Sequence, residues 1–199
     1  MQVREIGTGL WYWTGRHPAW TPADGGPDGW EQEVGCVYYE GPDAVVLFDP
    51  LVPMEDPVRF HEALERDLER AGKPVRVLLT VEAHVRSAQE LAERYGGTVA
   101  DLPGGGAPEL PAGVELAAEA LEEFVFWLPG HGALVSGDVI ISRGGEVCLP
   151  RSWIGEERLD EALELLRPLL DLPVEVVLVT HGEPVLEGAR ESLARALAG

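Results

Sequence analysis

Hydrophobic and polar positions along the chain follow two alternating periods. Continuous or period-two apolar runs such as "VVLF" and "VEVVLV" are typical of buried strands. Segments with an apolar residue at every third or fourth position follow them and are typical of helices. This alternation predicts a layered α/β protein. A chain of 199 residues can bury one full core, so residues 1–199 are expected to form a single domain.

Two helices can be placed by the residues at their ends. In "DPVRFHEALERDLERAG", Asp56 is the expected N-cap, Pro57 takes the first helical position, and Gly72 ends the helix. A second helix is expected to begin just after Ser87, because Ser87 and Glu90 have the spacing of a capping box.

The other apolar runs predict hairpins and a final strand. One hairpin turns at residues 41–43 and leads into "AVVLFDP", and another turns at residues 129–132 and leads into "ALVSGD". A helix around residues 156–170, the strand "VEVVLVT" and a last helix from about Glu187 complete the chain. Residues 101–113 are rich in Gly and Pro, which predicts a surface loop and a candidate lid.

Ionisable residues stand where the predicted buried strands end. Asp49 ends "VVLFD", Glu82 and His84 follow "VLLT", Asp138 ends "ALVSGD", and His181 ends "VVLVTH". Ligands of α/β sheets bind beyond the carboxyl ends of the strands, so these residues are expected to face one cleft. Histidines and carboxylates gathered in this way can form a metal site or an acid/base site. Each residue taken alone is also compatible with a polar loop cap.

The order of these elements resembles the metallo-β-lactamase superfamily. The most specific pieces are "LVSGD" and "VTHGEP", which are similar to the family's Gly-Asp strand end and its final His-Gly. The resemblance covers nearly the whole chain and implies a four-layer αββα sandwich. Hydrolases of the family hold one or two zinc or iron ions through a T-H-x-H-x-D-H stretch, a later His, the Asp of the Gly-Asp pair and the last His. Asp138 and His181 match the last two of these ligands.

The main metal-binding stretch departs from the family pattern, because it reads "TVEAHVR" here. With Thr80 as the anchor, the family's ligand positions fall on Val81, Ala83, Val85 and Arg86. None of these side chains binds a metal as placed. His131 lies in the predicted turn rather than near residues 117–118, where the resemblance implies the later His, so it is expected to be an exposed turn residue.

Two interpretations of the cleft remain open. In the first, a shifted site of Glu82, His84, Asp138 and His181 holds one zinc, iron or manganese ion, which activates a water for hydrolysis. In the second there is no metal cofactor, because Arg86 brings its own cation into the cleft. The second is favoured, since a shift of one residue ordinarily turns side chains away.

The metal-free interpretation places specific contacts in the cleft. Arg86 is expected to pair with Asp138, and His181 to hydrogen-bond Asp49 or Glu82. Such a cleft could bind a small anion through Arg86, or carry out acid/base chemistry with a histidine. A purely structural polar network is equally compatible with the residues.

The N-terminal part of the chain adds a candidate ligand pocket. Four tryptophans and His17 stand within residues 11–30. His17 and Trp20, with Asp49 and Arg86, are candidate pocket residues for an apolar or aromatic small molecule. Alternatively, the tryptophans pack under a long loop or form a homodimer contact.

Charge and composition narrow the range of partners. A net charge of −20 repels phosphate backbones and anionic lipid, so nucleic acid and membranes are not expected partners. The N-terminus has no apolar signal segment, and a cytoplasmic protein is expected. Cys36 and Cys148 are far apart in the sequence and are expected to be reduced, mostly buried thiols.

Two classes of function follow. The first is a hydrolase-like enzyme with an altered, metal-poor site that acts on a small ester, thioester or lactone. His84, Asp138 and His181 are its candidate catalytic residues. The second is a non-catalytic descendant that binds a small anionic or aromatic ligand, or a protein partner, through the old cleft. The sequence leaves open whether the protein is an enzyme.

Overall fold

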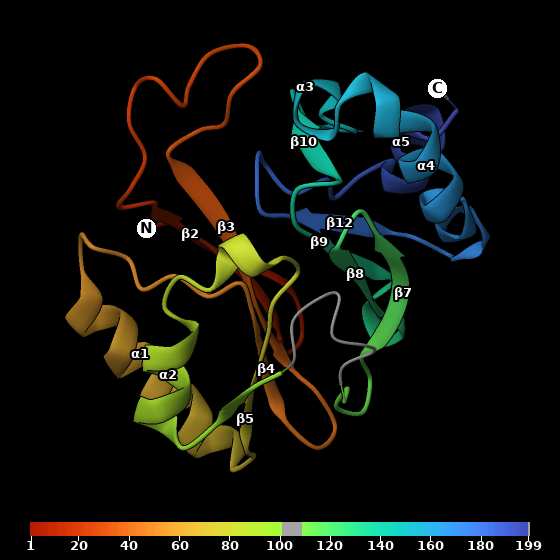
Figure 1. The fold of residues 1–199 in the computed structure, drawn as a ribbon. Helices are drawn as coiled ribbons and strands as arrows, with labels where there is room; N and C mark the ends of the chain where they lie inside the picture. The colour runs from red at the N-terminus through yellow and green to blue at the C-terminus, as the bar shows by residue number, and fades with distance from the viewer. Residues whose placement is uncertain (101–108, 199) are drawn as a thin grey trace.

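The computed structural model of the protein describes residues 1–100 and 109–198 (Figure 1). One sheet has the strand order β1-β2-β3-β4-β5-β6. Its strands from β1 to β4 pair antiparallel, and β5 and β6 are added in parallel. The strands are β1 (Val3–Gly7), β2 (Leu10–Arg16), β3 (Glu33–Glu40), β4 (Val45–Phe48), β5 (Val75–Leu78) and β6 (Thr98–Val99).

The second sheet has the order β12-β9-β8-β7, and β10 and β11 form a separate hairpin. β9 pairs antiparallel with β8 and parallel with β12, so residues 137–175 form the crossover that returns the chain to this sheet. The strands are β7 (Glu115–Ala120), β8 (Glu123–Leu128), β9 (Ala133–Ser136), β10 (Ile141–Arg143), β11 (Glu146–Cys148) and β12 (Val176–Val179).

The longer helices lie on the outer faces of the two sheets, and α3 lies beside β10 (Figure 1). α1 and α2 cover the first sheet, and α4 and α5 cover the second. The helices are α1 (Pro57–Ala71), α2 (Ala88–Tyr95), α3 (Arg151–Ile154), α4 (Glu156–Leu166) and α5 (Ala189–Ala196), with 3-10 turns η1 (Glu82–His84), η2 (Pro129–His131) and η3 (Arg167–Asp171).

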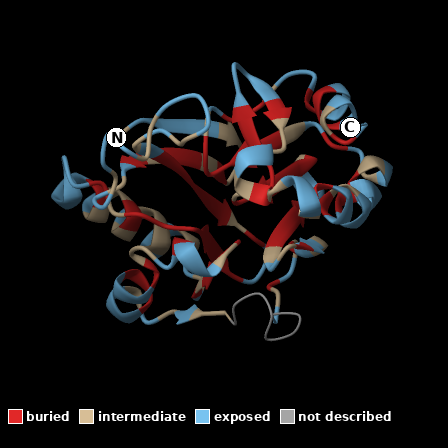
Figure 2. Ribbon diagram, turned by 45° about the horizontal axis from the view of Figure 1, so that its top comes forward, coloured by how far each residue is buried: buried red, intermediate tan, exposed pale blue. Residues whose placement is uncertain are grey.

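Three apolar clusters correspond to the three spaces between these layers. The central cluster joins the inner faces of both sheets, with Phe48 on one side and Phe124 and Phe126 on the other. A second cluster packs α1 and α2 against the first sheet, and a third packs α4 and α5 against the second. Figure 2 shows the buried residues along the strands between these layers. The predicted αββα sandwich is confirmed.

The predicted N-cap of α1 is confirmed, and the predicted capping box of α2 is wrong. The Asp56 carboxylate accepts a hydrogen bond from the backbone N–H of Arg59 at 3.2 Å, and Gly72 ends the helix in a left-handed conformation. α2 begins at Ala88 as expected, but Ser87 makes no side-chain cap bond. Its hydroxyl accepts instead from the N–H of Val52 at 3.0 Å, which ties the start of α2 to the loop after β4.

The two sheets meet directly beside the strand ends. The N–H of Gly35 in β3 donates to the carbonyl of Thr180 at 2.7 Å, and the hydroxyl of Tyr12 donates to the carbonyl of Val179 at 3.0 Å. A Cβ at residue 35 would lie only 2.1 Å from the Tyr12 hydroxyl. Glycine is therefore required at this position, where the backbones of the two sheets come close together.

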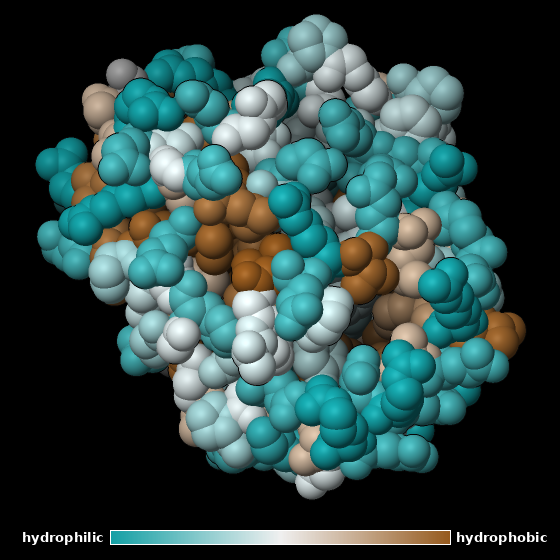
Figure 3. Space-filling view, turned by 180° about the vertical axis from the view of Figure 1, so that it is seen from behind, coloured by the Kyte–Doolittle hydropathy of each residue, from teal (hydrophilic) through white to brown (hydrophobic). Residues whose placement is uncertain are grey.

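Among the described residues, the exposed large apolar side chains are those of Val3, Met54, Val58, Val85 and Leu165. Figure 3 shows a mostly hydrophilic face with apolar side chains gathered in small patches, in keeping with the net charge of −20. Cys36 is a buried and Cys148 a half-buried free thiol, as predicted. Within the described residues, no helix is long and apolar enough to cross a membrane. Residues 109–113 of the expected loop lie outside helices and strands, and residues 101–108 of the candidate lid lie outside the described residues.

Candidate functional site

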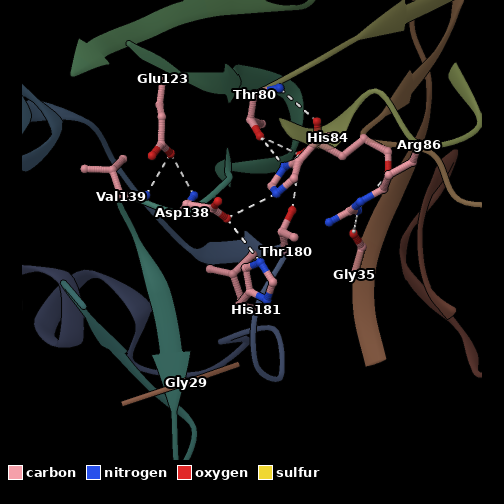
Figure 4. Close-up of polar contacts among 12 residues, drawn as sticks. Gly29, Gly35, Thr80, His84, Arg86, Glu123, Asp138, Val139, Thr180 and His181 are labelled. Atoms are coloured by element: carbon pink, nitrogen blue, oxygen red, sulfur yellow. Dashed lines mark hydrogen bonds and ion pairs between the residues drawn. The ribbon is translucent and has the colours of Figure 1, made fainter. Parts of the chain in front are cut away.

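The strand ends of both sheets bring four of the predicted residues together. Asp49 follows β4, His84 lies in η1 after β5, Asp138 follows β9, and His181 follows β12. Figure 4 shows His84, Asp138 and His181 directed toward one another. Their loops come from distant parts of the chain and meet where the two sheets are in contact. The site therefore depends on the whole sandwich and not on one local motif.

Two imidazoles flank one carboxylate at the centre of this group. The Nε2 atoms of His84 and of His181 each lie 3.2 Å from Oδ1 of Asp138. One donor atom from each of these three residues lies within 4.8 Å of the others. Both histidines are buried and Asp138 is half-buried. Two nitrogens and one oxygen thus converge on one small volume.

Asp49 lies behind His84 and is fully engaged. Its Oδ1 accepts from the N–H of Thr80 at 2.8 Å, and its Oδ2 accepts from the hydroxyls of Thr80 and Thr180 at 2.6 and 3.1 Å. Nδ1 of His84 lies 3.0 Å from the same Oδ2. The backbone of Asp49 is left-handed, with φ 46°, a strained conformation that surrounding contacts must hold. This buried carboxylate orients the imidazole of His84.

The charges of these groups stabilise one another. Burial alone would lower the pKa of His84, but the charge of Asp49, its hydrogen bond to His84 and the contact with the Asp138 carboxylate outweigh it and raise the pKa to about 9. Burial would raise the pKa of Asp138, and the contacts with His181 and His84 lower it well below its usual range instead. His181 has a lowered pKa because it is buried. Without a metal, His84 is therefore an imidazolium between two carboxylates.

This charge state predicts a pH-dependent stability. A histidine with a folded-state pKa raised from 6.5 to about 9 stabilises the fold fully below pH 6.5 and loses that contribution as the pH rises through 9. We expect the free energy of unfolding of the metal-free protein to fall by about 1–3 kcal/mol over this window. Urea unfolding measured at several pH values would check this. His84→Ala should flatten the decline above pH 7, and an equal slope in both proteins would contradict the assignment.

Glu123, at the start of β8, was not predicted from the sequence. Its Oε2 accepts hydrogen bonds from the backbone N–H groups of Asp138 and Val139 at 2.7 and 2.8 Å (Figure 4). Burial, together with the charge of Asp138, raises the pKa of Glu123 to about 7. Glu123 thus fixes the loop that carries Asp138. Nothing in "LEEFVFW" distinguishes it from its neighbour Glu122, so no signal in the sequence could have found it.

Arg86 and His181 make contacts that differ from the predicted ones. Nη1 of Arg86 donates to the carbonyls of Asp49 and Gly35 at 3.1 and 3.4 Å, and Asp138 pairs with the two histidines instead. His181 contacts Asp138 rather than Asp49, because the oxygens of Asp49 are already engaged. Arg86, with φ 34°, is bound to the backbone of the first sheet and does not occupy the centre of the site.

Glu82 does not join the cluster. η1 directs His84 inward, where it is buried, and leaves Glu82 exposed at the other end of the same turn. Among the described residues, the group of donors close enough to share a metal consists of His84, Asp138 and His181. Three of the four residues predicted for the shifted site thus lie together, and Glu82 does not join them. His131 lies in η2, where its ring packs against Tyr39 at 5.7 Å, and it is half-buried rather than exposed.

The partners of the three donor residues also suit a single metal ion. Among the described residues, Oδ1 of Asp138 is buried and has no partner with hydrogen-bond geometry, although two imidazole nitrogens lie 3.2 Å away. Two imidazole nitrogens and one carboxylate oxygen at these distances are also a donor set that a single cation could share. His84 also has the carboxylate partner on its other nitrogen that metal-binding histidines usually have. Nδ1 of His181 is buried without such a partner in the described part of the chain.

An aromatic pocket opens onto the cluster. It has a volume of about 480 Å³ and is lined by His17, Trp30, Arg86, Glu123 and Trp153, among others. The rings of Trp30 and Trp153 each lie 5.2 Å from the ring of His181, edge to face. His17 packs on Trp30 at 5.2 Å. Trp20 lines an adjoining hollow.

Comparison with known proteins identifies the fold. No family model matches the chain, and no curated protein matches it. Among solved structures, VMB-1 is 13% identical with a TM-score of 0.64 and covers 99% of this chain and 94% of its own. Metallo-β-lactamase IND-7 is 16% identical, with a TM-score of 0.63 and coverage of 100% and 98%. An NDM_FIM-1 like metallo-β-lactamase from Erythrobacter litoralis, in a mono-zinc form, is 14% identical, with a TM-score of 0.63 and coverage of 99% and 94%.

The chain therefore has the metallo-β-lactamase fold, as its resemblance to that superfamily predicted. At these identities the comparisons define the architecture alone, and any activity has to be argued from the residues of the site.

Proposed function

We propose that the protein is a single-metal hydrolase of small esters, thioesters or lactones. The observation that carries the proposal is the convergence of His84, Asp138 and His181 within 4.8 Å, with a buried oxygen of Asp138 left without a directed hydrogen bond. This differs from the metal-free interpretation that the sequence favoured, because Arg86 binds the backbone of the first sheet and leaves the centre to the three donors.

The donor set suits one zinc, iron or manganese ion. Two imidazoles and one carboxylate are ligands that these ions accept, and three protein ligands leave a position open for water or substrate. Such an ion, when bound, supplies a water with a pKa near 7 and polarises a carbonyl group. One similar enzyme of this fold is described in a mono-zinc form, so a one-ion site is compatible with the architecture.

The residues around the cluster have distinct roles in this proposal. Asp49 holds Nδ1 of His84, which directs Nε2 toward the other two donors. Glu123 binds the backbone of Asp138 and fixes its loop. Trp30 and Trp153 pack on His181 and keep solvent from its ring, while the pocket beside them receives the substrate.

Metal loading tests the proposal most directly. Protein stripped with a chelator should bind zinc, iron(II) or manganese(II) with a stoichiometry of one in calorimetry, and its melting temperature should rise. The loaded protein should hydrolyse at least one member of a panel of small esters, thioesters and lactones faster than the stripped protein. If no ion binds stoichiometrically and none raises the melting temperature, the proposal fails.

The alternative is a non-catalytic binding protein. It is favoured by the His84 imidazolium, which can neutralise Asp49 and Asp138 without any metal. In that case the aromatic pocket with Arg86 would hold a small anionic or aromatic ligand. Ligand binding that persists in chelator-treated protein, with no hydrolysis of the panel, would favour this alternative.

A further inference from the structure

A second hollow adjoins the site on the far side of Trp30 and Trp153. It has a volume of about 600 Å³ and shares those two residues and His181 with the first pocket. Trp20 adds a third indole, and glycines line much of the rest. The cluster and this hollow can therefore contact two ends of one small molecule.

Hydrogen bonds from their indole N–H groups hold Trp20 and Trp153 in place. Nε1 of Trp20 donates to the carbonyl of Trp30 at 2.9 Å, and Nε1 of Trp153 donates to the carbonyl of Asp28 at 2.7 Å. The N–H groups of both rings are thus used within the protein. What these two residues offer to a ligand in the hollow they line is the apolar, electron-rich part of the ring.

The loop that carries Trp20 and Trp30 is tied to the second half of the sandwich. The guanidinium of Arg143 in β10 donates to the carbonyls of Pro27 and Gly29 at 2.7 and 3.4 Å. A Cβ at residue 29 would lie 2.1 Å from the carbonyl of Asp24, so the loop closes tightly at that glycine. The walls of the hollow are held in place before any ligand arrives, which lowers the entropic cost of binding.

The charges around the hollow favour a cation. Glu31 and Glu183 are exposed lining residues whose two negative charges exceed the positive charge of Arg143 in the same lining, and the guanidinium of Arg143 is held against the loop carbonyls. The chain as a whole carries a net charge of −20, which attracts cations over a longer range. Indole faces combined with nearby carboxylates form the kind of site that binds alkylammonium groups.

We propose that this hollow binds the quaternary or protonated ammonium group of the substrate, with the ester or thioester carbonyl of the same molecule at the three-donor cluster. The inference rests on the proposed function and names its substrate class as esters of amino alcohols and their thioester analogues. Hydrolysis adds water across the bond between the acyl carbon and the alcohol oxygen, or thiol sulfur. The acyl group takes the hydroxide, and the amino alcohol or amino thiol leaves with the proton.

Binding of a cation and of its neutral isostere tests the inference without any need for activity. Choline and 3,3-dimethylbutan-1-ol have nearly the same shape and differ in the charged nitrogen. Choline is expected to bind at least about fivefold more tightly by calorimetry, and added salt should reduce the difference. Equal or tighter binding of the neutral alcohol overturns the inference.

Substitutions of lining residues test whether choline binds in this hollow. Trp20→Ala and Glu183→Gln should each weaken choline binding, and Glu183→Gln keeps the shape of an exposed side chain. Trp11→Phe is the matched control, because Trp11 lines a groove against α1 elsewhere in the molecule. It should leave choline binding unchanged. If Trp11→Phe weakens binding as much as the other two variants, the hollow is not the site.

Kinetics separate this inference from the proposed function. With metal-loaded protein, a choline ester should have a higher kcat/KM than the 3,3-dimethylbutyl ester of the same acid. If choline binds but neither ester is hydrolysed, the hydrolase proposal fails and the cation site stands. If both esters are hydrolysed equally and choline does not bind, the hydrolase proposal stands and the cation site is wrong.

Discussion

Asp138→Ala should abolish metal binding while the fold is retained. Oδ1 of Asp138 lies 3.2 Å from each imidazole nitrogen, so its loss removes the donor that the two histidines share. Loss of a residue that merely orients a metal ligand typically costs about 10- to 100-fold in affinity, so loss of the ligand itself should cost more than about 100-fold. Calorimetric titration of chelator-treated protein with zinc measures this change, and circular dichroism checks the fold.

Glu82→Ala is the matched control for this experiment. Glu82 lies in the same 3-10 turn as His84 and carries the same type of donor as Asp138, but it is exposed and stands outside the cluster. Its replacement should leave zinc affinity unchanged. A loss with Glu82→Ala comparable to that with Asp138→Ala would restore the four-ligand site, and unchanged affinity in Asp138→Ala would remove the metal site from consideration.

The polar positions at the strand ends were predictable from the sequence because they depend on strand order alone. Asp49, His84, Asp138 and His181 each follow an apolar run, and parallel pairing of β4 with β5 and of β9 with β12 brings the carboxyl ends of each pair to one edge. Their mutual contacts were not predictable in the same way. The side chain of His84 turns inward because η1 is a 3-10 turn, and no pattern of letters in "TVEAHVR" fixes that conformation.

The caps at the starts of α1 and α2 also show which contacts can be predicted from the sequence. Asp56 caps α1 as the local sequence requires, because its partner is three residues away. Ser87 has the correct local spacing, but its hydroxyl is taken by Val52, a residue 35 positions earlier in the chain. Similarly, Glu123 and Trp153 belong to the site through contacts with Asp138 and His181 that only the assembled sandwich provides. Sequence reasoning is sound where the competing partners are local and fails where a distant partner forms the stronger contact.

Asp49→Asn should give the largest loss of stability in this site. Oδ2 of Asp49 is within hydrogen-bond distance of the hydroxyls of Thr80 and Thr180 and of Nδ1 of His84, and all of these groups are buried. An amide at this position loses the negative charge that compensates the His84 imidazolium. Breaking a buried charge pair by removing one partner costs about 3–5 kcal/mol, and urea unfolding of the metal-free variant should show a loss of that size.

The loss of stability caused by Asp49→Asn should depend on whether His84 is present. In a His84→Ala background the charge that Asp49 neutralises is gone, so Asp49→Asn should cost much less than it does in the unmodified protein. Strict additivity of the two substitutions would contradict the coupling. In the Asp49→Asn variant, the free energy of unfolding should no longer fall between pH 6.5 and 9. Without Asp49 the pKa of His84 is not raised so far. These results would identify Asp49 as the residue that keeps His84 positively charged in the metal-free protein and fixes the orientation of its ring.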